Sequence, residues 1–484
     1  MMHWRSIIRI VGLLITLLSV FMLIPALVAL IYRDGGGTIF IQSFVVALIL
    51  GIVLWLPNRK QKSELSTREG FLIVVLFWVV LGTIGSFPFI FDNHLNLNLT
   101  TAFFESFSGL TTTGATSIIH LDTLPKALLF YRQLLQWLGG MGIIVLAVAI
   151  LPLLGVGGMQ LYRAEIPGPQ KDNKMRPRIA QTAKTLWSIY IILTVVCALC
   201  LWLAGMNLFD AISHSFSTIS MGGFSTHDNS LAYFDNAVIN YIITFFLILS
   251  GCNFGLHFIS FSQFSIKHYF RDQEFRTFLM ILGALMVISI VLIYVWGGVS
   301  GFETSIDKIV LQVVSTASTT GFSVDTMSSW PPVLPILLLC ASFIGGCAGS
   351  TGGGMKVVRV LLLFMQGSRE LKRLVHPNAI YSLKLNNRVL PERIIESVWG
   401  FFSAYALVFL VSLFIVMASG VSAMDAFYIV SSSLNNLGIG IGEASDSFNN
   451  VSDLVKWVMI VDMLFGRLEI FTLLVIFTPV FWKS

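Results

Sequence analysis

Long apolar runs separated by short polar stretches dominate the hydrophobic pattern of this chain. A helix that crosses a bilayer needs about 20 predominantly apolar residues. The runs that approach or exceed this length are 7–32, 38–57, 71–91, 126–154, 182–205, 236–262, 277–298, 332–365, 394–419 and 456–481. The pattern therefore predicts an all-α polytopic membrane protein with about ten transmembrane helices.

Four shorter segments between these runs are only half apolar. They are 99–113, 208–222, 304–320 and 422–437. They are short and rich in Ser, Thr and Asn, which makes them unsuited to crossing a bilayer. They are long enough for a helix that enters the membrane and stops there, so we expect four re-entrant helices.

The ends of the four half-polar segments align without a gap. They read SGLTTTGATS, STISMGGFST, STASTTGFSV and SSLNNLGIGI, and one glycine falls in the same column each time: Gly114, Gly223, Gly321 and Gly438. Four copies in register indicate an internal repeat. Each copy is expected to contain a span, a short helix, a glycine turn and a second span.

The repeat divides the chain into five parts. We expect an N-terminal two-helix region at 1–68, followed by repeats at 69–180, 181–273, 274–392 and 393–484. The predicted fold is thus two N-terminal transmembrane helices plus four span–pore helix–span repeats. If the four short helices converge on one axis, they surround a single pseudo-fourfold pore.

Composition and charge agree with a membrane protein and orient it. The chain is 56% hydrophobic and 11% charged, whereas soluble domains carry about 25% charged residues. Lys and Arg gather before the first span, between the second and third, and in 163–184, 267–276 and 369–393. These places share one side if the half-polar segments re-enter, and the positive-inside rule makes that side cytoplasmic. The basic residues thus report topology, and nothing points to nucleic acid.

Acidic residues gather on the opposite side, where the half-polar segments enter. They are Asp92, Glu105, Asp122, Asp228, Asp235, Asp325, Glu443, Asp446 and Asp453. Two interpretations remain open. The acids attract cations toward the membrane, or they only keep short loops soluble.

The glycine turns lie where a cation pathway can be built. Non-helical backbone at membrane depth is tolerated only where it is buried in protein or lines a water-filled path. Four turns around one axis would surround a pore with carbonyl oxygens, which can replace the water shell of K⁺, and glycine permits the positive φ that such a turn needs. The expected filter residues are Thr112, Thr113, Gly114, Gly222, Gly223, Thr319, Thr320, Gly321, Asn436, Leu437 and Gly438. The alternative is four loops that only pack helix ends.

A glycine-rich stretch, GGCAGSTGGGMK at 345–356, interrupts the span after the third half-polar segment. It does not match the phosphate-binding loop pattern G-x-x-x-x-G-K-[ST], because Met355 precedes Lys356 and Val357 follows it. Repeated glycines break a helix, so we expect a flexible intramembrane loop that blocks permeation until it moves. Its expected gate residues are Gly345, Gly346, Gly349, Ser350, Thr351, Gly352, Gly353, Gly354 and Lys356. A helix kink that serves packing is the alternative.

Arg467 is a cation inside the last apolar run. Charges within membrane spans usually face a cavity or a partner, so we expect Arg467 to complete the gate by repelling cations and contacting the glycine loop. The alternatives are an ion pair with Asp462 or Glu469, or a side chain that reaches the membrane surface. Arg132 and Lys126 lie nearer a helix start and are expected at the membrane interface.

The motifs TTTGAT, MGGFST, TTGFSV and NNLGIGIG, together with two extra N-terminal spans, resemble the Trk/Ktr/HKT superfamily of K⁺ transporters. The resemblance covers nearly the whole chain. It implies a homodimeric K⁺ uptake protein of the bacterial inner membrane, with four units around one pore in each chain. It also implies the same intramembrane loop and a basic gate residue in the fourth unit. Two departures from a K⁺-channel filter stand out. Each repeat shares one glycine rather than the two of TVGYG, and the fourth repeat carries Asn435, Asn436 and Leu437 where the others have mostly Ser, Thr or Met.

The resemblance also implies partners. K⁺ is the expected permeant ion and Rb⁺ a similar one, with no covalently bound cofactor. A cytosolic nucleotide-binding regulator resembling TrkA is expected to control opening. The basic segments 163–184 and 369–393 are plausible docking surfaces for it, and anionic lipid is an equally good interpretation.

Other functions compete with a channel. A symporter that couples K⁺ to H⁺ or Na⁺ would need a titrating carboxylate within the membrane, and Asp462 or Glu469 are the candidates. An enzyme would need a catalytic cluster, and neither H-E-x-x-H nor G-x-S-x-G occurs. His214 and His257 are isolated in apolar stretches, so we expect packed residues and no enzyme.

Overall fold

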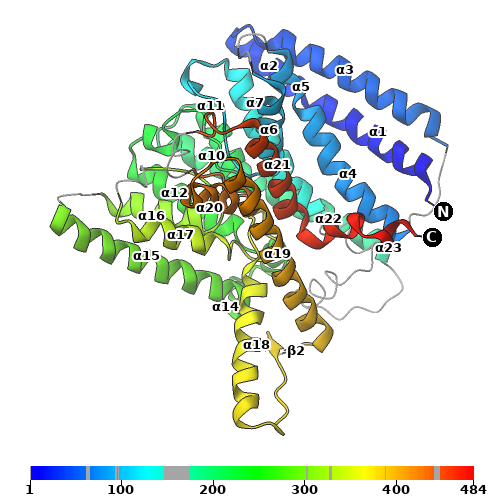
Figure 1. Ribbon diagram of the computed structural model, residues 1–484. Coiled ribbons are helices and arrows are strands. Elements are labelled where there is room, and N and C mark those ends of the chain that lie inside the picture. Colours follow the sequence, from blue (N-terminus) through cyan, green and yellow to red (C-terminus); the bar gives the residue numbers. More distant parts are fainter. Residues whose placement is uncertain are drawn as a thin grey trace.

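The computed structural model describes residues 2–60, 66–92, 95, 97–145, 175–300, 304–325, 330–386, 388–440 and 447–483. These residues are mostly helical (Figure 1). The longer helices outside the half-polar segments are α1 (Trp4–Phe21), α2 (Leu23–Tyr32), α3 (Gly37–Trp55), α4 (Thr67–Gly85), α7 (Lys126–Val145), α10 (Met175–Leu203), α12 (Ala237–Ser250), α13 (Phe254–Ser262), α15 (Gln273–Ser300), α17 (Val333–Ser342), α18 (Val357–Val375), α19 (Glu392–Ala418), α21 (Asp453–Leu468) and α22 (Ile470–Phe477). Smaller elements are η1 (Leu56–Asn58), α5 (Phe87–Phe91), η2 (Leu121–Thr123), η4 (Ser230–Tyr233), α14 (Lys267–Arg271), α23 (Pro479–Trp482), β1 (Lys384–Leu385) and β2 (Arg388–Val389).

Among the described residues, six helical stretches are long and apolar enough to cross a membrane. They are Trp4–Tyr32, Gly37–Asn58, Arg68–Phe91, Ala183–Leu203, Gln273–Gly297 and Glu392–Ala418. A seventh span results if α12 and α13 are counted together. The predicted span 126–154 begins as α7 and runs on into residues outside the described part. A multi-pass membrane protein is therefore confirmed, and the total of ten spans stays a prediction.

Several predicted spans are broken rather than continuous. The run 236–262 bends by 93° between α12 and α13, because Asn253 starts a new helix by accepting a hydrogen bond from the Gly255 amide (2.7 Å). The glycine-rich interruption between α17 and α18 is where the sequence predicts it. A further break falls at Glu469, whose positive φ of 58° separates α21 from α22, and the sequence pattern does not reveal it.

The four half-polar segments form short helices, as predicted. They are α6 (Leu99–Leu110), α11 (Leu208–Ser220), α16 (Ile306–Ala317) and α20 (Ala423–Leu434). Side chains of Asn98, Asn207 and Ser422 cap three of their N-termini, which satisfies amides that the helix leaves unpaired. Acidic residues in the first turns of α11, α16 and α20 further favour the positive ends of the helix dipoles.

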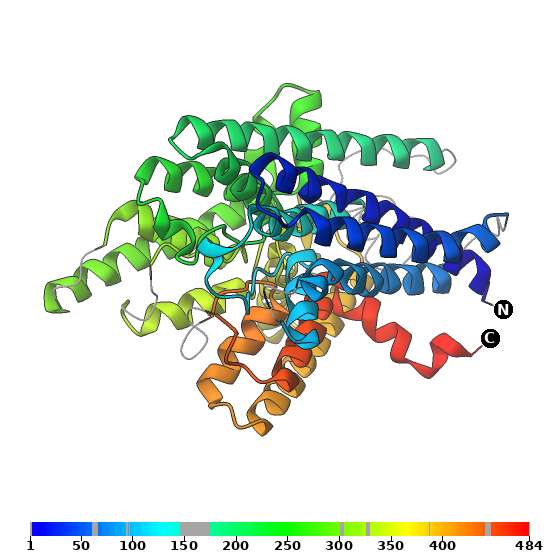
Figure 2. The same ribbon diagram turned by 90° about the horizontal axis from the view of Figure 1, so that it is seen from above.

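The short helices lie inside a ring of longer ones. Each packs against a neighbouring long helix: α6 on α7, α11 on α10, α16 on α12, and α20 on α21. Seen from above, the helices follow one another around the centre in chain order, from cyan through green and yellow to orange (Figure 2). The N-terminal helices α1 and α3 pack on each other outside this ring, where α1 also packs against α4 and α3 against α5.

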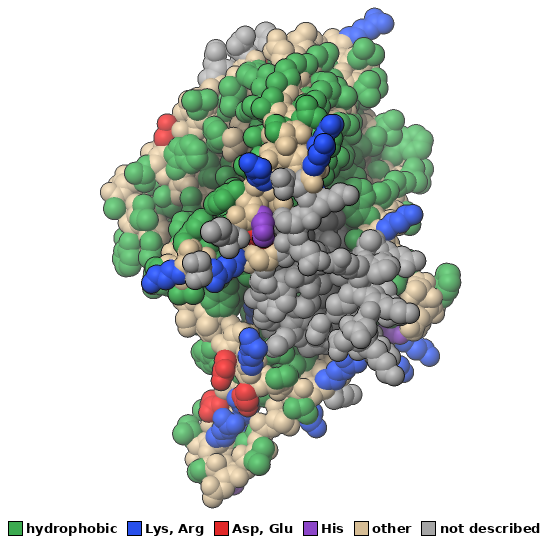
Figure 3. Space-filling view, turned by 90° about the vertical axis from the view of Figure 1, so that its right-hand side faces the viewer, with side chains coloured by type: hydrophobic (Ala, Val, Ile, Leu, Met, Phe, Trp, Pro, Cys, Tyr) green, Lys and Arg blue, Asp and Glu red, His purple; other side chains and the backbone are tan. Residues whose placement is uncertain are grey.

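One helix leaves the bundle as an arm. The far end of α18 extends away from the other helices and returns through the β1–β2 hairpin (Figure 1), in which Lys384 pairs with Val389. The sequence pattern does not predict these strands. On the face shown in Figure 3, hydrophobic side chains cover much of the upper part, whereas most Lys and Arg lie in the lower part, toward the arm. This distribution agrees with a cytoplasmic arm.

Candidate functional site

All four short helices end in the same hydrogen-bonded turn. The amides of Thr113, Gly222, Thr320 and Leu437 donate to serine carbonyls at the end of their own helix, at 2.9, 2.8, 2.8 and 2.8 Å. The accepting residues are Ser108, Ser217, Ser315 and Ser432. Each of these bonds joins residues five apart, and a second backbone bond between residues three apart lies inside it. The two bonds together are the Schellman motif, which ends many helices. The four turns are therefore equivalent in backbone structure as well as in sequence.

The residue that makes this turn left-handed is not glycine. Thr112, Met221, Thr319 and Asn436 have φ of 55°, 55°, 64° and 54°. The left-handed conformation costs about 1–2 kcal/mol for a residue with a side chain. Two positions later the shared glycine is again left-handed, with φ between 77° and 94°. Such strain, repeated four times, persists only where surrounding contacts hold the backbone in this shape.

The shared glycines close the four turns into one ring. A Cβ added at Gly114 would come within 3.0 Å of the carbonyl oxygen of Gly222 in the next turn. The same clash relates Gly223 to Thr320, Gly321 to Leu437, and Gly438 back to Thr113. Each turn thus abuts its successor, and the fourth abuts the first. Only glycine allows both the positive φ and this approach, so the column identified in the sequence is explained twice.

The asparagines of the fourth turn connect it to other units. The side-chain nitrogen of Asn436 donates to the Thr113 hydroxyl (3.0 Å) and to the Met463 carbonyl (2.9 Å). The Asn435 amide nitrogen donates to Ser342 (2.9 Å), and Tyr405 donates to the Asn435 oxygen. These amides bind neighbouring side chains and backbone behind the turn, which accounts for the departure from Ser and Thr.

The glycine loop between α17 and α18 lies directly against the ends of three short helices. The Gly353 amide donates to the Thr319 hydroxyl (2.7 Å), and the Thr351 hydroxyl donates to the Ile219 carbonyl (3.0 Å). A Cβ on Gly353 would clash with the Asn435 carbonyl. The loop therefore sits below α11, α16 and α20, as expected of a loop beneath the ring.

A buried carboxylate fastens both ends of this loop. Glu274, at the start of α15, is 4% exposed and accepts hydrogen bonds from the amides of Ala348 (2.7 Å) and Val358 (3.2 Å). Lys356 in turn donates from its ammonium to the Gly352 carbonyl. Sequence reasoning missed Glu274, because an acid at a helix start reads as an ordinary first-turn residue.

Arg467 locks the loop from below. Its side chain is 3% exposed and donates to the carbonyls of Thr351 (2.8 Å) and Gly139 (3.0 Å). It thus joins the loop of the third unit to α7 of the first. The alternative ion pairs do not form, since Glu469 pairs with Arg359 (2.8 Å) and Asp462 accepts from Ser412 (2.6 Å).

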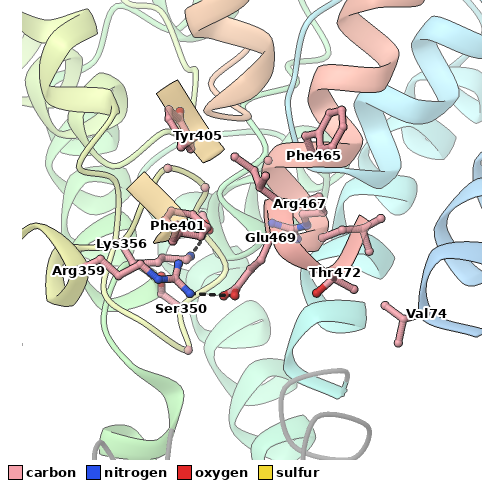
Figure 4. A pocket seen from close by; sticks show the side chains of 17 residues that line it. Val74, Ser350, Lys356, Arg359, Phe401, Tyr405, Phe465, Arg467, Glu469 and Thr472 are labelled. Atoms are coloured by element: carbon pink, nitrogen blue, oxygen red, sulfur yellow. Dashed lines mark hydrogen bonds and ion pairs between the residues drawn. The ribbon is translucent and has the colours of Figure 1, made fainter. Parts of the chain in front are cut away.

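A cavity of about 90 Å³ opens beside the loop. Figure 4 shows the side chains of Lys356, Arg359, Arg467 and Glu469 converging on it from α18, its preceding loop and the α21–α22 break. Candidate gate residues from two parts of the chain line this cavity: Gly349, Ser350 and Gly352–Gly354 belong to the loop, and Arg467 belongs to α21. Gly345 and Gly346 lie at the loop's start, where the Gly346 carbonyl accepts from the Val357 amide (3.1 Å).

Two expectations about charged residues are wrong. Arg132 is not interfacial: it is 1% exposed and pairs with Glu105 at 3.4 Å. Glu105 and Asp92 are buried as well, so they are not part of an exposed acidic face, while Glu443 and Asp446 lie outside the described residues. Neither error is visible in the sequence, because the partner of Arg132 comes from another helix. His214 and His257 are buried and hydrogen-bonded, as expected.

The loop after the second turn contains a histidine that is paired with two aspartates. His227 contacts Asp122 and Asp210 and stacks on Tyr233 with ring centroids 3.5 Å apart. Burial lowers the pKa of His227, but hydrogen bonds and charge from Asp210 and Asp122 outweigh it and raise the pKa above its usual value. The pKa of Asp122 is lowered: burial raises it, and the bond from His227 more than compensates.

The geometry agrees with known proteins. Residues 36–484 match the family TrkH, described as cation transport protein. The Trk system potassium uptake protein TrkH of Escherichia coli strain K12 is 64% identical over 483 residues, covering 100% of both chains. The namesake from Vibrio parahaemolyticus is 59% identical over 485 residues and also covers both chains fully. The crystal structure of the potassium transporter TrkH from Vibrio parahaemolyticus superimposes with a TM-score of 0.92, at 56% identity and full coverage of both chains.

Proposed function

Because this chain belongs to the family of TrkH cation transport proteins, we propose that it takes up K⁺ across the bacterial inner membrane through the ring of four glycine turns. The observation that carries the proposal is the closure of that ring, in which each shared glycine abuts a carbonyl of the next turn. Each of the four turns thus brings one carbonyl oxygen to the ring, and backbone carbonyl oxygens can replace the water shell of a cation such as K⁺.

The ring acts as the selectivity filter in this proposal. Thr112–Gly114, Gly222–Gly223, Thr319–Gly321 and Asn436–Gly438 supply its backbone. The four short helices point their C-terminal ends at it, and the negative ends of the helix dipoles favour a cation there. Rb⁺, which is close to K⁺ in size, is expected to pass as well.

The glycine loop and Arg467 form the gate. The loop lies against three of the four helix ends, and Arg467 holds it while placing a buried cation beneath the ring. A permeating K⁺ meets both a steric and an electrostatic barrier. Opening therefore requires the loop to leave Thr319 and Arg467.

Assembly and control are further parts of the proposal. We assign the repeats to 69–180, 181–273, 274–392 and 393–484, after the two-helix region 1–68. A cytosolic nucleotide-binding regulator resembling TrkA would dock on the basic arm 369–393, and two chains would form a homodimer. Within the arm, Arg369 pairs with Glu392 (2.7 Å), so intramolecular pairing occupies part of its charge. Of the other predicted docking segment, 163–184, residues 163–174 lie outside the described residues, and 175–184 belongs to α10.

A second candidate function is symport of K⁺ with H⁺ or Na⁺. The observation in its favour is Asp462, a carboxylate buried within α21 that accepts a hydrogen bond from Ser412 (2.6 Å). Ionisable residues inside membranes often serve in proton or ion pathways. Glu469, the other candidate, pairs with Arg359 and is partly exposed, which makes it a weaker choice.

Flux in liposomes separates the two functions. Purified protein is reconstituted, and K⁺, Rb⁺, Na⁺ and Li⁺ fluxes are compared between the parent chain and Gly321→Ser. The channel proposal expects K⁺ and Rb⁺ to run down their own gradients, with a relaxed preference in Gly321→Ser. If K⁺ accumulates only when a H⁺ or Na⁺ gradient is imposed, symport replaces it. If no ion moves in either chain, nor in Arg467→Ala, in which the loop has lost its lock, the ring has no transport role.

A further inference from the structure

A polar side chain at one column of the repeat braces the backbone beyond the glycine in three of the four units. Glu105, His214 and Gln312 stand the same distance ahead of the shared glycine, in α6, α11 and α16. Ile429 occupies the column in α20. We propose that Glu105, His214 and Gln312 are positioning residues that hold the outer strands of the filter and thereby set cation selectivity. The inference rests on the proposed filter.

In the first unit the brace is a buried carboxylate. One oxygen of Glu105 accepts from the Thr116 hydroxyl (2.8 Å) and from the amide of Ile118 (3.2 Å). The other oxygen meets Arg132 at 3.4 Å, and Arg132 also donates to Thr116 (2.9 Å). A single side chain thus fixes the strand that follows Gly114, and Arg132 compensates its charge.

In the second unit the brace is a histidine. His214 lies 2.9 Å from the Asp210 carbonyl through Nδ1 and 3.0 Å from the Ser225 hydroxyl through Nε2. A carbonyl can only accept, so Nδ1 carries the proton and Nε2 accepts from Ser225. The neutral imidazole therefore ties α11 to the strand after Gly223.

In the third unit the brace is an amide. The Gln312 side-chain oxygen accepts from the Val324 backbone amide (3.1 Å), and its nitrogen donates to Thr316 (3.3 Å). Gln312 is fully buried. Removing its oxygen would leave the Val324 amide without this acceptor in a buried setting, which is costly.

The braces are chemically different yet reach the same place, which distinguishes them from packing. Carboxylate, imidazole and amide all present an acceptor to the strand that leaves the glycine. The first two are also coupled, because Arg132 donates to the Ser225 carbonyl (3.4 Å) and stacks over Phe224 at 4.2 Å. The apolar side chain of Ile429 can neither donate nor accept, so the fourth unit has no brace at this column.

The braces affect selectivity because the backbone segment that each one holds directly follows a shared glycine of the ring. Selective coordination depends on the positions and the field of backbone oxygens. A strand tied two or three residues beyond the glycine holds the preceding carbonyls in place. Loss of the tie lets the oxygens move inward or outward, so that a smaller ion is accepted more readily.

The test is the Na⁺ to K⁺ flux ratio in liposomes for four variants. Gln312→Met keeps the length of the side chain and removes the acceptor, whereas Gln312→Glu retains an acceptor oxygen. Ile429→Met is the matched control in the unbraced column. Ser225→Ala removes one hydroxyl from the second brace and is a small change that preserves packing if Gln312→Met fails to insert.

We expect Gln312→Met and Ser225→Ala to raise the ratio by about threefold to tenfold, the effect of one hydrogen bond. Gln312→Glu and Ile429→Met should stay near the parent chain. The inference is overturned if Gln312→Met and Ser225→Ala leave the ratio unchanged while Gly321→Ser shifts it, because the filter then stands without the braces. It is also overturned if Ile429→Met shifts the ratio equally. If Gly321→Ser has no effect either, the proposed filter itself fails.

Discussion

The ring of glycine turns and the loop beneath it are built on opposite principles. The ring uses one turn four times, with equivalent hydrogen bonds and equivalent glycines in every unit. Among the described residues, the loop occurs once, between α17 and α18. The corresponding break in the second unit, between α12 and α13, only bends the chain at Gly251–Asn253. A cation in a filter needs oxygen ligands on all sides, whereas a single movable segment is enough to block a pathway.

The two regions also differ in how they are held. The ring is fixed by many short contacts, including the backbone bonds of each turn. The loop depends on a few long side chains, chiefly Arg467 and Glu274. Single substitutions should therefore affect the rate of transport through the loop and the choice of ion through the ring.

The largest effect is expected for Arg467→Ala. It removes two hydrogen bonds from a charged donor to the carbonyls of Thr351 and Gly139, each worth about 1.5–3 kcal/mol. The closed loop should lose stability, and K⁺ flux in liposomes without a regulator should rise by about tenfold to a hundredfold. Arg467→Lys keeps the charge with fewer hydrogen-bond donors, so its K⁺ flux should lie between that of the parent chain and that of Arg467→Ala. Flux at or below the parent level for Arg467→Ala would contradict a locking role.

The next effect is expected in the ring, for Gly438→Ala. The new methyl group must displace the Thr113 carbonyl, so the Na⁺ to K⁺ flux ratio should rise by about tenfold. Gly420→Ala is the control, since Gly420 has φ of 95° and open space around it. It carries the backbone strain of about 1–2 kcal/mol without a clash. Equal flux ratios in the two variants would show that the close approach has no role in selectivity.

A smaller effect is expected for Glu274→Gln. The side-chain oxygen of the glutamine can still accept from the amides of Ala348 and Val358. Its NH₂ group, however, brings a new donor into a buried site, and a buried donor without an acceptor costs about 1 kcal/mol or more. K⁺ flux should rise about fivefold through a looser loop, with the ion ratio unchanged. Glu392→Gln changes an exposed carboxylate that pairs with Arg369, away from the loop. Flux should stay at the parent level there; a rise like that of Glu274→Gln would remove the special role of the buried acid.

The smallest effect concerns pH and lies outside both regions. The raised pKa of His227 means that its ion pairs stabilise the fold fully below the unfolded-state value of about 6.5. That stability is lost as pH rises through the higher folded value. Asp122, with its lowered pKa, stays charged over this range. The melting temperature of the parent chain should fall by about 1–2 °C between pH 5.5 and 9 relative to His227→Gln. If the melting temperatures of the parent chain and His227→Gln change with pH in parallel, the stabilising ion pairs of His227 are contradicted.

The sequence predicts the ring better than its surroundings, for a physical reason. A fourfold repeat exposes the shared glycines because each copy must satisfy the same backbone conformation. Arg467 and the glycine loop are also predicted, since a charge and a helix break are conspicuous in an apolar run. The contact of Arg132 with Glu105 depends on how two helices pack, and a hydrophobic pattern contains no information on that. The bend at Asn253 is missed because the polar and small residues at 250–253 form only a short interruption in a run that is long and apolar enough, on average, for one span.

Measuring rate and ion ratio together in the same liposomes tests the central claim most directly. K⁺ flux and the Na⁺ to K⁺ ratio are recorded for the parent chain, Arg467→Ala and Gly438→Ala. The account predicts that Arg467→Ala raises the rate and leaves the ratio unchanged, whereas Gly438→Ala raises the ratio. If Arg467→Ala shifts the ratio as much as Gly438→Ala does, or Gly438→Ala changes only the rate, then ring and loop do not divide selection from gating.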